Sequence, residues 1–156
     1  MKKQTNAQTI TLTILRVLIG WHFLYEGWSK LQNSSWSSIG YLMDSKGWFE
    51  TFFKYLASIP EFISISNIMV VWGLVLIGIS LIAGLFTRIG LISGIALLAM
   101  FYLSHPPIIN PEYLMPMEGN YLWVDKNLIE IAALTLLLAF KSNKIGIDRF
   151  IFRKKN

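Results

Sequence analysis

The chain has 156 residues, of which 54% are hydrophobic and 15% charged, and its formal net charge is +5. A mean hydropathy of +0.50 is too high for a soluble domain of this size, so composition favours a membrane protein with one domain, residues 1–156. The absence of cysteine excludes disulfides, thiolate metal ligands and thiol nucleophiles. Nucleic-acid binding is not indicated, because the positive charge gathers near the chain ends.

Four apolar segments predict membrane-spanning helices, at about 9–28, 63–86, 89–105 and 123–140. A helix that crosses the hydrocarbon core needs roughly 20 residues. The first two segments reach that length unaided, whereas the third and fourth need their flanking residues. Backbone polar groups must be satisfied within each span, so the predicted fold class is all-α, an integral membrane four-helix bundle.

The first segment carries four ionisable side chains, Arg16, His22, Glu26 and Lys30. The last three are spaced four residues apart, so they share one face of a helix. Two interpretations of Glu26 stay open, an ordinary ion pair with Lys30 or a proton-handling carboxylate. Arg16 either extends toward the cytoplasmic interface or anchors an anionic or carbonyl-bearing ligand.

Two glycines, Gly20 and Gly27, lie on a neighbouring face of the same segment. Small residues allow two membrane helices to approach closely. We therefore expect this face to contact another helix of the bundle.

The connection 31–62 predicts a short amphipathic helix in the first external loop. Glu50 and Lys54 are spaced as an i,i+4 pair. Apolar residues recur there at helical spacing, namely Phe49, Phe52, Phe53 and Leu56. This helix is expected to lie on the outer membrane interface or to cap the bundle.

Glu130 lies about one turn inside the fourth segment. One interpretation is an ion pair with Lys126. The other is a proton-carrying carboxylate in a wet pocket shared with the first segment, near His22 and Glu26. The cost of burying an isolated charge favours the pocket.

Most polar side chains of the four apolar segments lie in the outer half of the predicted membrane spans, so we expect a site that opens toward the outer side of the membrane. The candidate proton-handling groups are Glu130, Glu26 and His22. The candidate ligand-binding side chains, which include one from the inner half, are Arg16, Lys30, Asn67, Tyr102 and Asn127. His22 and His105 lack HxxxH or HxxE spacing, so no metal site is predicted.

The placement of lysine and arginine predicts the orientation. Nine of these residues lie at the termini or in the tight link at Arg88, including the basic tail 141–156, whereas four lie on the opposite side. The positive-inside rule then puts both termini in the cytoplasm. The expected location is the bacterial cytoplasmic (inner) membrane.

Several stretches in order resemble one known family. The segment RVLIGWHFLYEGWSKL at 16–31 resembles the opening motif of DoxX-type membrane proteins, with Arg16, Gly20, Gly27 and Lys30 at its characteristic places. WGLVLIGISLIAGLFTRIG at 72–90 is similar to the second-span motif, with its glycines and closing Thr-Arg pair. EGNYLWVDKNLIEIAAL at 118–134 is similar to the fourth-span motif, with Asn127 and Glu130.

The resemblance implies a four-helix membrane protein. One branch, DoxD, is the membrane subunit of an archaeal thiosulfate:quinone oxidoreductase, and the first external loop here is similar to that branch. Many members carry a glutamate near the position of Trp72, where this chain has tryptophan.

Two functions stay open. The first is a quinone-linked oxidoreductase subunit, which needs a second protein subunit as the source of electrons. The second is a non-enzymatic scaffold or small-molecule handler in a redox or detoxification system. Quinone is the one cofactor implied, and the expected partners are membrane lipids, quinone and the second subunit.

Overall fold

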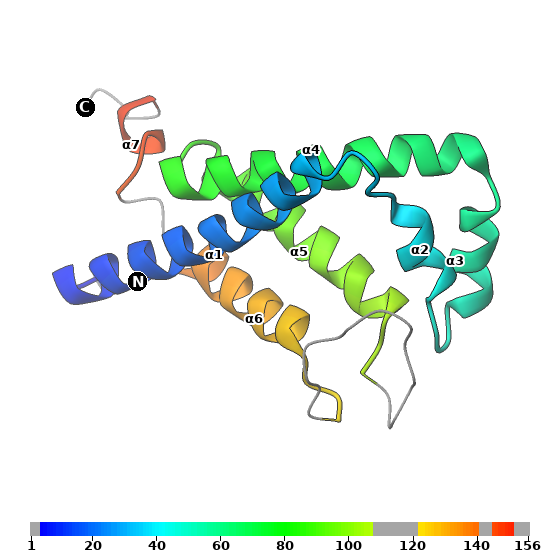
Figure 1. Cartoon of the computed structure of the whole chain (residues 1–156). Helices are drawn as coiled ribbons and strands as arrows, with labels where there is room; N and C mark the ends of the chain where they lie inside the picture. Colours follow the sequence, from blue (N-terminus) through cyan, green and yellow to red (C-terminus); the bar gives the residue numbers. More distant parts are fainter. Residues whose placement is uncertain (1–3, 108–121, 141–144, 152–156) are drawn as a thin grey trace.

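The computed structural model describes residues 4–107, 122–140 and 145–151. Every element assigned within these ranges is a helix (Figure 1). In chain order the helices are α1 (Asn6–Gln32), α2 (Ser38–Met43), α3 (Glu50–Ala57), α4 (Pro60–Ala83), α5 (Thr87–Ser104), α6 (Lys126–Ala139) and α7 (Asp148–Ile151).

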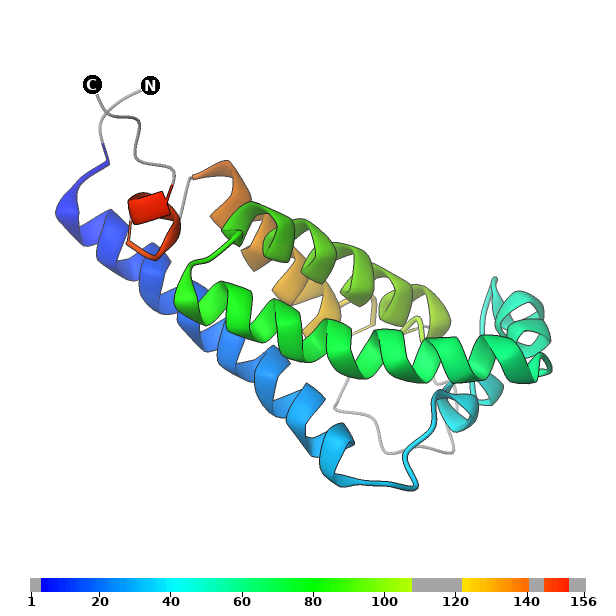
Figure 2. The same ribbon diagram turned by 90° about the horizontal axis from the view of Figure 1, so that it is seen from above.

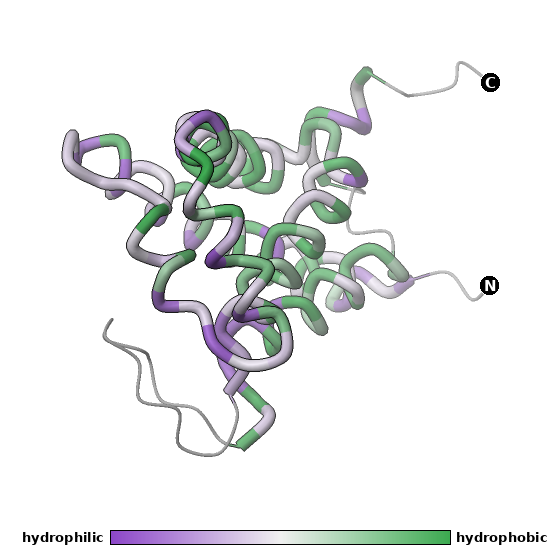
Figure 3. The backbone as a smooth tube through the Cα atoms, turned by 90° about the vertical axis from the view of Figure 1, so that its right-hand side faces the viewer, coloured by the Kyte–Doolittle hydropathy of each residue, from purple (hydrophilic) through white to green (hydrophobic). Residues whose placement is uncertain are grey.

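Three helices, α1, α4 and α5, are long and apolar enough to cross a membrane, with 27, 24 and 18 residues. Helix α6 has 14 residues, fewer than the roughly 17 that a straight span requires. Hydrophobic colouring predominates along the long helices, whereas hydrophilic segments concentrate in the connections (Figure 3). Large apolar side chains such as Leu18, Trp21 and Leu76 are 60–62% exposed, as lipid-facing residues are.

Glycines bring α1 and α4 close together. A Cβ atom at Gly27 would lie 2.7 Å from Val75 Cγ2, and one at Gly78 would lie 2.6 Å from the Leu24 backbone nitrogen. Gly20 likewise faces Leu81. The expectation that Gly20 and Gly27 contact another helix is therefore confirmed.

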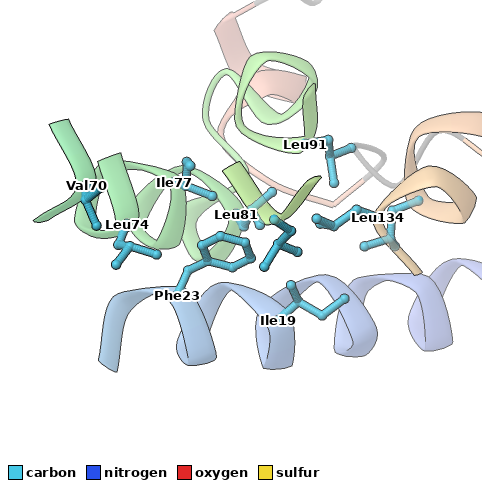
Figure 4. Close-up of a cluster of buried hydrophobic side chains, with 10 residues drawn as sticks. Ile19, Phe23, Val70, Leu74, Ile77, Leu81, Leu91 and Leu134 are labelled. Atoms are coloured by element: carbon cyan, nitrogen blue, oxygen red, sulfur yellow. The ribbon is translucent and has the colours of Figure 1, made fainter. Parts of the chain in front are cut away.

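The hydrophobic core lies where α1, α4, α5 and α6 meet. Ile19 and Phe23 rise from α1 toward side chains of the other helices (Figure 4). Leu81 from α4 and Leu134 from α6 are fully enclosed at 0% exposure. Each such leucine stabilises the packed state by about 1.5–3 kcal/mol where burial removes it from water, and less where lipid is the alternative.

The connection between α1 and α4 contains two short helices, where the sequence pattern indicates one. Phe53 and Ala57 of α3 are buried beside Leu42 of α2, whereas Phe52 and Tyr55 are exposed. Helix α2 has six residues, too few for a recognisable period, and its capping comes from the Ser37 hydroxyl, which accepts from the Ile39 backbone nitrogen.

The start of α1, the α4–α5 turn and α7 gather at one end of the molecule, which we call the terminal end (Figure 2). The Gln4 side-chain amide donates to the Phe140 carbonyl, so the end of α6 lies there too. Arg88 lies in the first turn of α5 rather than in the link before it. Of the predicted basic tail 141–156, only 145–151 falls within the described residues.

Candidate functional site

A cavity of about 260 Å³ lies at the opposite end, which we call the cavity end. Its walls come from the second half of α1, the first two thirds of α4, the last turns of α5, the start of α6, and the short helices α2 and α3. Apolar and aromatic side chains form much of the surface, among them Phe23, Leu42, Phe53, Leu74, Leu98 and Phe101. The cavity wall is thus mostly apolar, with polar groups contributed by several of the helices around it.

One face of α1 supplies three of those polar groups. His22, Glu26 and Lys30 all line the cavity, as their four-residue spacing on one helix face indicates. Lys30 Nζ lies 2.5 Å from Glu26 Oε2, so the ordinary ion pair that the spacing allowed is formed. The Lys30 ammonium also lies 5.8 Å from the centre of the Trp36 ring, within cation–π range.

Glu130 points from α6 toward α1, in the direction that the sequence indicates. Its Oε1 lies 2.6 Å from His22 Nδ1. Glu130 is not among the residues that line the cavity, whereas His22, which it contacts, is. Among the described residues, no cluster of three histidine or carboxylate side chains has the arrangement of a metal site.

Helix α2 forms part of the cavity wall, and hydrogen bonds hold this helix and its flanking residues in place on two sides. The Asn67 side-chain oxygen accepts from the Ser38 backbone nitrogen at 2.7 Å. On the α5 side, the Tyr41 hydroxyl donates to the Phe101 carbonyl at 3.3 Å, and the Ser45 hydroxyl donates to the Ser104 carbonyl at 2.7 Å. Asn67 is a candidate ligand-binding residue from the sequence, and in the structure its amide oxygen holds the start of α2 in place.

Tyr41 is a wall residue that sequence reasoning missed. It lies in a short polar connection whose position depends on contacts with α5, so no local pattern marks it. Its ring stacks on His105, with 3.9 Å between the ring centres. Burial lowers the pKa of His105 to about 4, and nearby Asp44 partly opposes this shift. His105 is therefore neutral at pH 7 and contributes as a packed aromatic ring.

The start of α6 forms another part of the wall. Asp125 caps the helix by accepting from the Leu128 backbone nitrogen at 2.9 Å, and it also accepts from the Asn127 amide at 2.8 Å. Asn127, a candidate ligand-binding residue from the sequence, lines the cavity. Tyr102 is not among the wall residues, and its hydroxyl donates to the Trp123 carbonyl at 2.9 Å.

Arg16 lies at the terminal end, away from this cavity. It is 1% exposed, and its guanidinium donates to the Ile145 carbonyl at 2.7 Å. The Asp148 carboxylate, which interacts with this charge, accepts from the backbone nitrogens of Phe86 and Thr87 at 2.7 and 2.9 Å. Neither sequence interpretation of Arg16 named this partner, because it lies 129 residues along the chain.

A close backbone contact between the α4–α5 turn and the residues after α6 allows Arg16 to reach the Ile145 carbonyl. Gly84 ends α4 in the left-handed region, at φ +65°, where glycine carries no steric cost. A Cβ atom there would lie 2.7 Å from the Gly146 Cα and 2.9 Å from an Arg16 guanidinium nitrogen. The described residues after α6, 145–151, therefore pack directly against the α4–α5 turn.

Comparison with known proteins identifies the family. The family model for DoxX matches residues 11–105, which include most of α1 and all of α2 through α5. No curated protein and no solved structure matches the chain. The matched region is more than half of the chain and contains both the glycine contact between α1 and α4 and the α1 wall of the cavity. The chain is a membrane protein that belongs to the DoxX family.

Proposed function

We propose that the cavity binds the ring of a small uncharged molecule of the quinone class. The observation that carries this proposal is the composition of the wall: apolar and aromatic side chains face a row of groups that donate and accept hydrogen bonds. Ligand sites of this kind are mostly apolar, with a few convergent polar groups that fix orientation. Quinones match both requirements, because a flat apolar ring carries two polar oxygens.

The charges around the cavity favour an uncharged ligand. Two carboxylates, Glu26 and Asp125, and two ammonium groups, Lys30 and Lys126, lie on the wall. Lys30 is paired with Glu26 at 2.5 Å, and Lys126 acts electrostatically on the same carboxylate. An anionic or cationic ligand would upset this balance in a poorly solvated site, whereas a neutral ring would not.

The volume supports a ring of modest size. About 260 Å³ corresponds to roughly eight or nine water molecules at about 30 Å³ each. A substituted six-membered ring fits this space, and a long isoprenoid tail would extend toward lipid. A bound quinone would supply a two-electron, two-proton acceptor, and the wall side chains that carry polar atoms on the α1 and α2 sides include His22, Glu26 and Tyr41.

The proposal includes the topology on which the site depends. We take α6 as a fourth span that completes a four-helix bundle, with both termini cytoplasmic and the cavity in the outer half. Contacts of α6 with α5 and α1 support the fourth span. The nine-to-four distribution of lysine and arginine supports the orientation. Electrons would come from a second protein subunit on the outer side.

A pair of substitutions on one helix tests the proposed site. Ser66 lines the cavity, whereas Ser64 is exposed on α4 two residues away. In lipid nanodiscs, Ser66→Phe should weaken binding of decylubiquinone at least tenfold by filling the cavity, and Ser64→Phe should bind as the parent does. Equal binding by both variants, or no binding by the parent, would reject the proposal.

A second assay separates the two roles that binding allows. A quinone-linked oxidoreductase subunit should reduce bound quinone when its electron-donating partner is added, and Ser66→Phe should abolish that reduction. A non-enzymatic small-molecule handler should bind quinone with the same dependence on Ser66 but should support no reduction with any co-purified protein.

A further inference from the structure

The His22 imidazole stands between two carboxylates that come from different helices. Nδ1 lies 2.6 Å from Glu130 Oε1 on α6, and Nε2 lies 4.0 Å from Glu26 Oε1 on α1. Both ring nitrogens therefore face an acceptor, but only Nδ1 is in close contact with one. The two nitrogens are chemically distinct positions in this fold.

The two partners of His22 differ in their relation to the cavity. His22 and Glu26 line it, whereas Glu130 is not a wall residue and contacts the imidazole at Nδ1. The Glu130 side chain is 16% exposed, half as much as the 31% of His22. Its second oxygen, Oε2, is enclosed and has no hydrogen-bond partner among the described residues. Glu130 is thus a carboxylate whose one close polar neighbour, among the described residues, is His22.

The contact between His22 Nδ1 and Glu130 Oε1 is short, but the two groups are not aligned. At the observed ring orientation Nδ1 and Oε1 do not meet the geometry of a hydrogen bond, although 2.6 Å separates them. Such contacts often tighten when a ligand is bound. A carboxylate at Nδ1 fixes the proton on that nitrogen and leaves Nε2 as the free position, as it does for histidines that bind metals or serve as general bases.

We propose that Glu130 is a positioning residue that holds His22 in its Nδ1-protonated form, so that Nε2 exchanges a proton with a ring oxygen of the molecule in the cavity. This inference rests on the proposed function. Nε2 accepts the proton of a ring hydroxyl, so that one O–H bond breaks and one N–H bond forms. The resulting imidazolium is stabilised by the Glu130 carboxylate at Nδ1. In the reverse direction Nε2–H donates to a ring carbonyl.

The assignment changes the role expected of Glu130. The sequence suggested that this carboxylate carries the proton itself. The imidazole lines the cavity wall and the carboxylate in contact with it does not, so Glu130 acts through His22. Glu26 lies beside Nε2 and is engaged by Lys30, which leaves it a weaker competitor for the ring nitrogen.

The first test needs no ligand. The chain has two histidines, so ¹⁵N-histidine labelling in nanodiscs gives signals from two imidazole rings. The signals that remain in His105→Gln are those of His22. At a pH where His22 is neutral, the parent should show the Nδ1-protonated form. Glu130→Leu should shift the tautomer ratio about tenfold or more toward Nε2–H, the factor expected when a charge-assisted hydrogen bond is lost.

Glu26→Leu is the matched control, because it removes the other carboxylate near the same ring. It should leave the His22 tautomer as in the parent. An Nε2-protonated parent, or a tautomer ratio that Glu130→Leu leaves unchanged, would overturn the inference whether or not any ligand binds. Near-native near-ultraviolet circular dichroism of each variant would exclude misfolding as the cause of a shift.

The second test adds decylubiquinol to the labelled parent. The His22 Nε2 signal should move on binding, and the His105 signals should not. If the quinol binds and Nε2 does not respond, the inference fails while the proposed function stands. If no quinol binds, the proposed function fails together with the ligand contact at Nε2, and the tautomer experiment still decides whether Glu130 positions His22.

Discussion

The terminal end and the cavity end deal with enclosed charge in opposite ways. At the terminal end, Arg16 is 1% exposed, donates to the Ile145 carbonyl and lies near Asp148, which itself caps α5. At the cavity end, Glu130 leaves one oxygen without a partner among the described residues, beside an imidazole that faces an open space. Burial of charge is expensive in both places.

The difference indicates what each end is for. Charges that are satisfied internally hold elements together, as Arg16 holds the segment after α6 to α1 and to the α4–α5 turn. Polar groups left incompletely satisfied next to a cavity are available to a ligand. The same helix, α1, therefore carries a structural residue in its first half and candidate binding residues in its second.

Removing the charge at the terminal end should have the largest effect on stability. Arg16→Met leaves the Ile145 carbonyl and the Asp148 carboxylate without their cation in an enclosed site. We expect a loss of about 3–5 kcal/mol, the range for breaking one partner of a buried charge pair. The free energy of unfolding in detergent measures it.

Arg88→Met is the matched control, because Arg88 lies at the same end but is exposed. It should change stability by less than about 0.5 kcal/mol. Equal losses in the two variants would mean that Arg16 acts through general charge rather than through its buried contacts.

Acid should destabilise the fold through His105, which lies next to the end of α5 at the cavity end. Burial lowers the pKa of His105 to about 4 in the folded protein, against an ordinary value near 6.5. Below about pH 6.5 the unfolded chain binds a proton there that the folded protein does not, so the stability present above that pH is lost as pH falls toward 4. The loss is on the order of 1–3 kcal/mol.

The difference in thermal midpoint between pH 7 and pH 4.5 checks this prediction. His105→Gln should reduce that difference, because glutamine takes up no proton. A parent and a variant with the same pH dependence would show that His105 does not titrate in this window.

Close contact between α1 and α4 should be sensitive to a single methyl group. A Cβ atom at Gly78 would lie 2.6 Å from the Leu24 backbone nitrogen and 2.8 Å from the Gly20 carbonyl oxygen. Because backbone cannot move aside cheaply, Gly78→Ala should cost about 1–3 kcal/mol. Gly73 on the same helix has no atom within 4 Å of the corresponding position, so Gly73→Ala should be neutral or slightly stabilising.

Thermal unfolding of the two alanine variants in one detergent makes this comparison directly. If both variants unfold at the same temperature as the parent, α1 and α4 can move apart without loss of stability. The α1–α4 contact then does not fix the geometry of the cavity.

Local patterns in the sequence predicted the parts that depend on one helix. The four-residue spacing of His22, Glu26 and Lys30 places all three on one helix face, which the structure shows to line the cavity, and the glycine spacing identifies the contact face of α1. The parts that depend on distant chain could not be predicted. Ile145 meets Arg16 across 129 residues, and α2 reaches the cavity only because Asn67 and the end of α5 hold it there.

Glu130 shows how far the sequence could predict the arrangement of a single site. Its depth in the fourth segment indicates that it turns toward His22, and the structure has it there. Whether the carboxylate or the imidazole faces the open space depends on a side-chain arrangement between two helices. The spacing of residues along α1 or α6 does not indicate which of the two side chains faces the cavity.

The most direct test of the account maps where a quinone binds. A photoreactive azidoquinone is cross-linked to the protein in nanodiscs, and labelled peptides are identified by mass spectrometry with and without excess decylubiquinone. We predict labels within 36–42 and 98–104, which contain Tyr41 and Phe101 of the cavity wall, and their suppression by the competitor. Suppressible labels at 84–88 or 145–151, or labels spread over lipid-facing residues that the competitor does not reduce, would contradict the account.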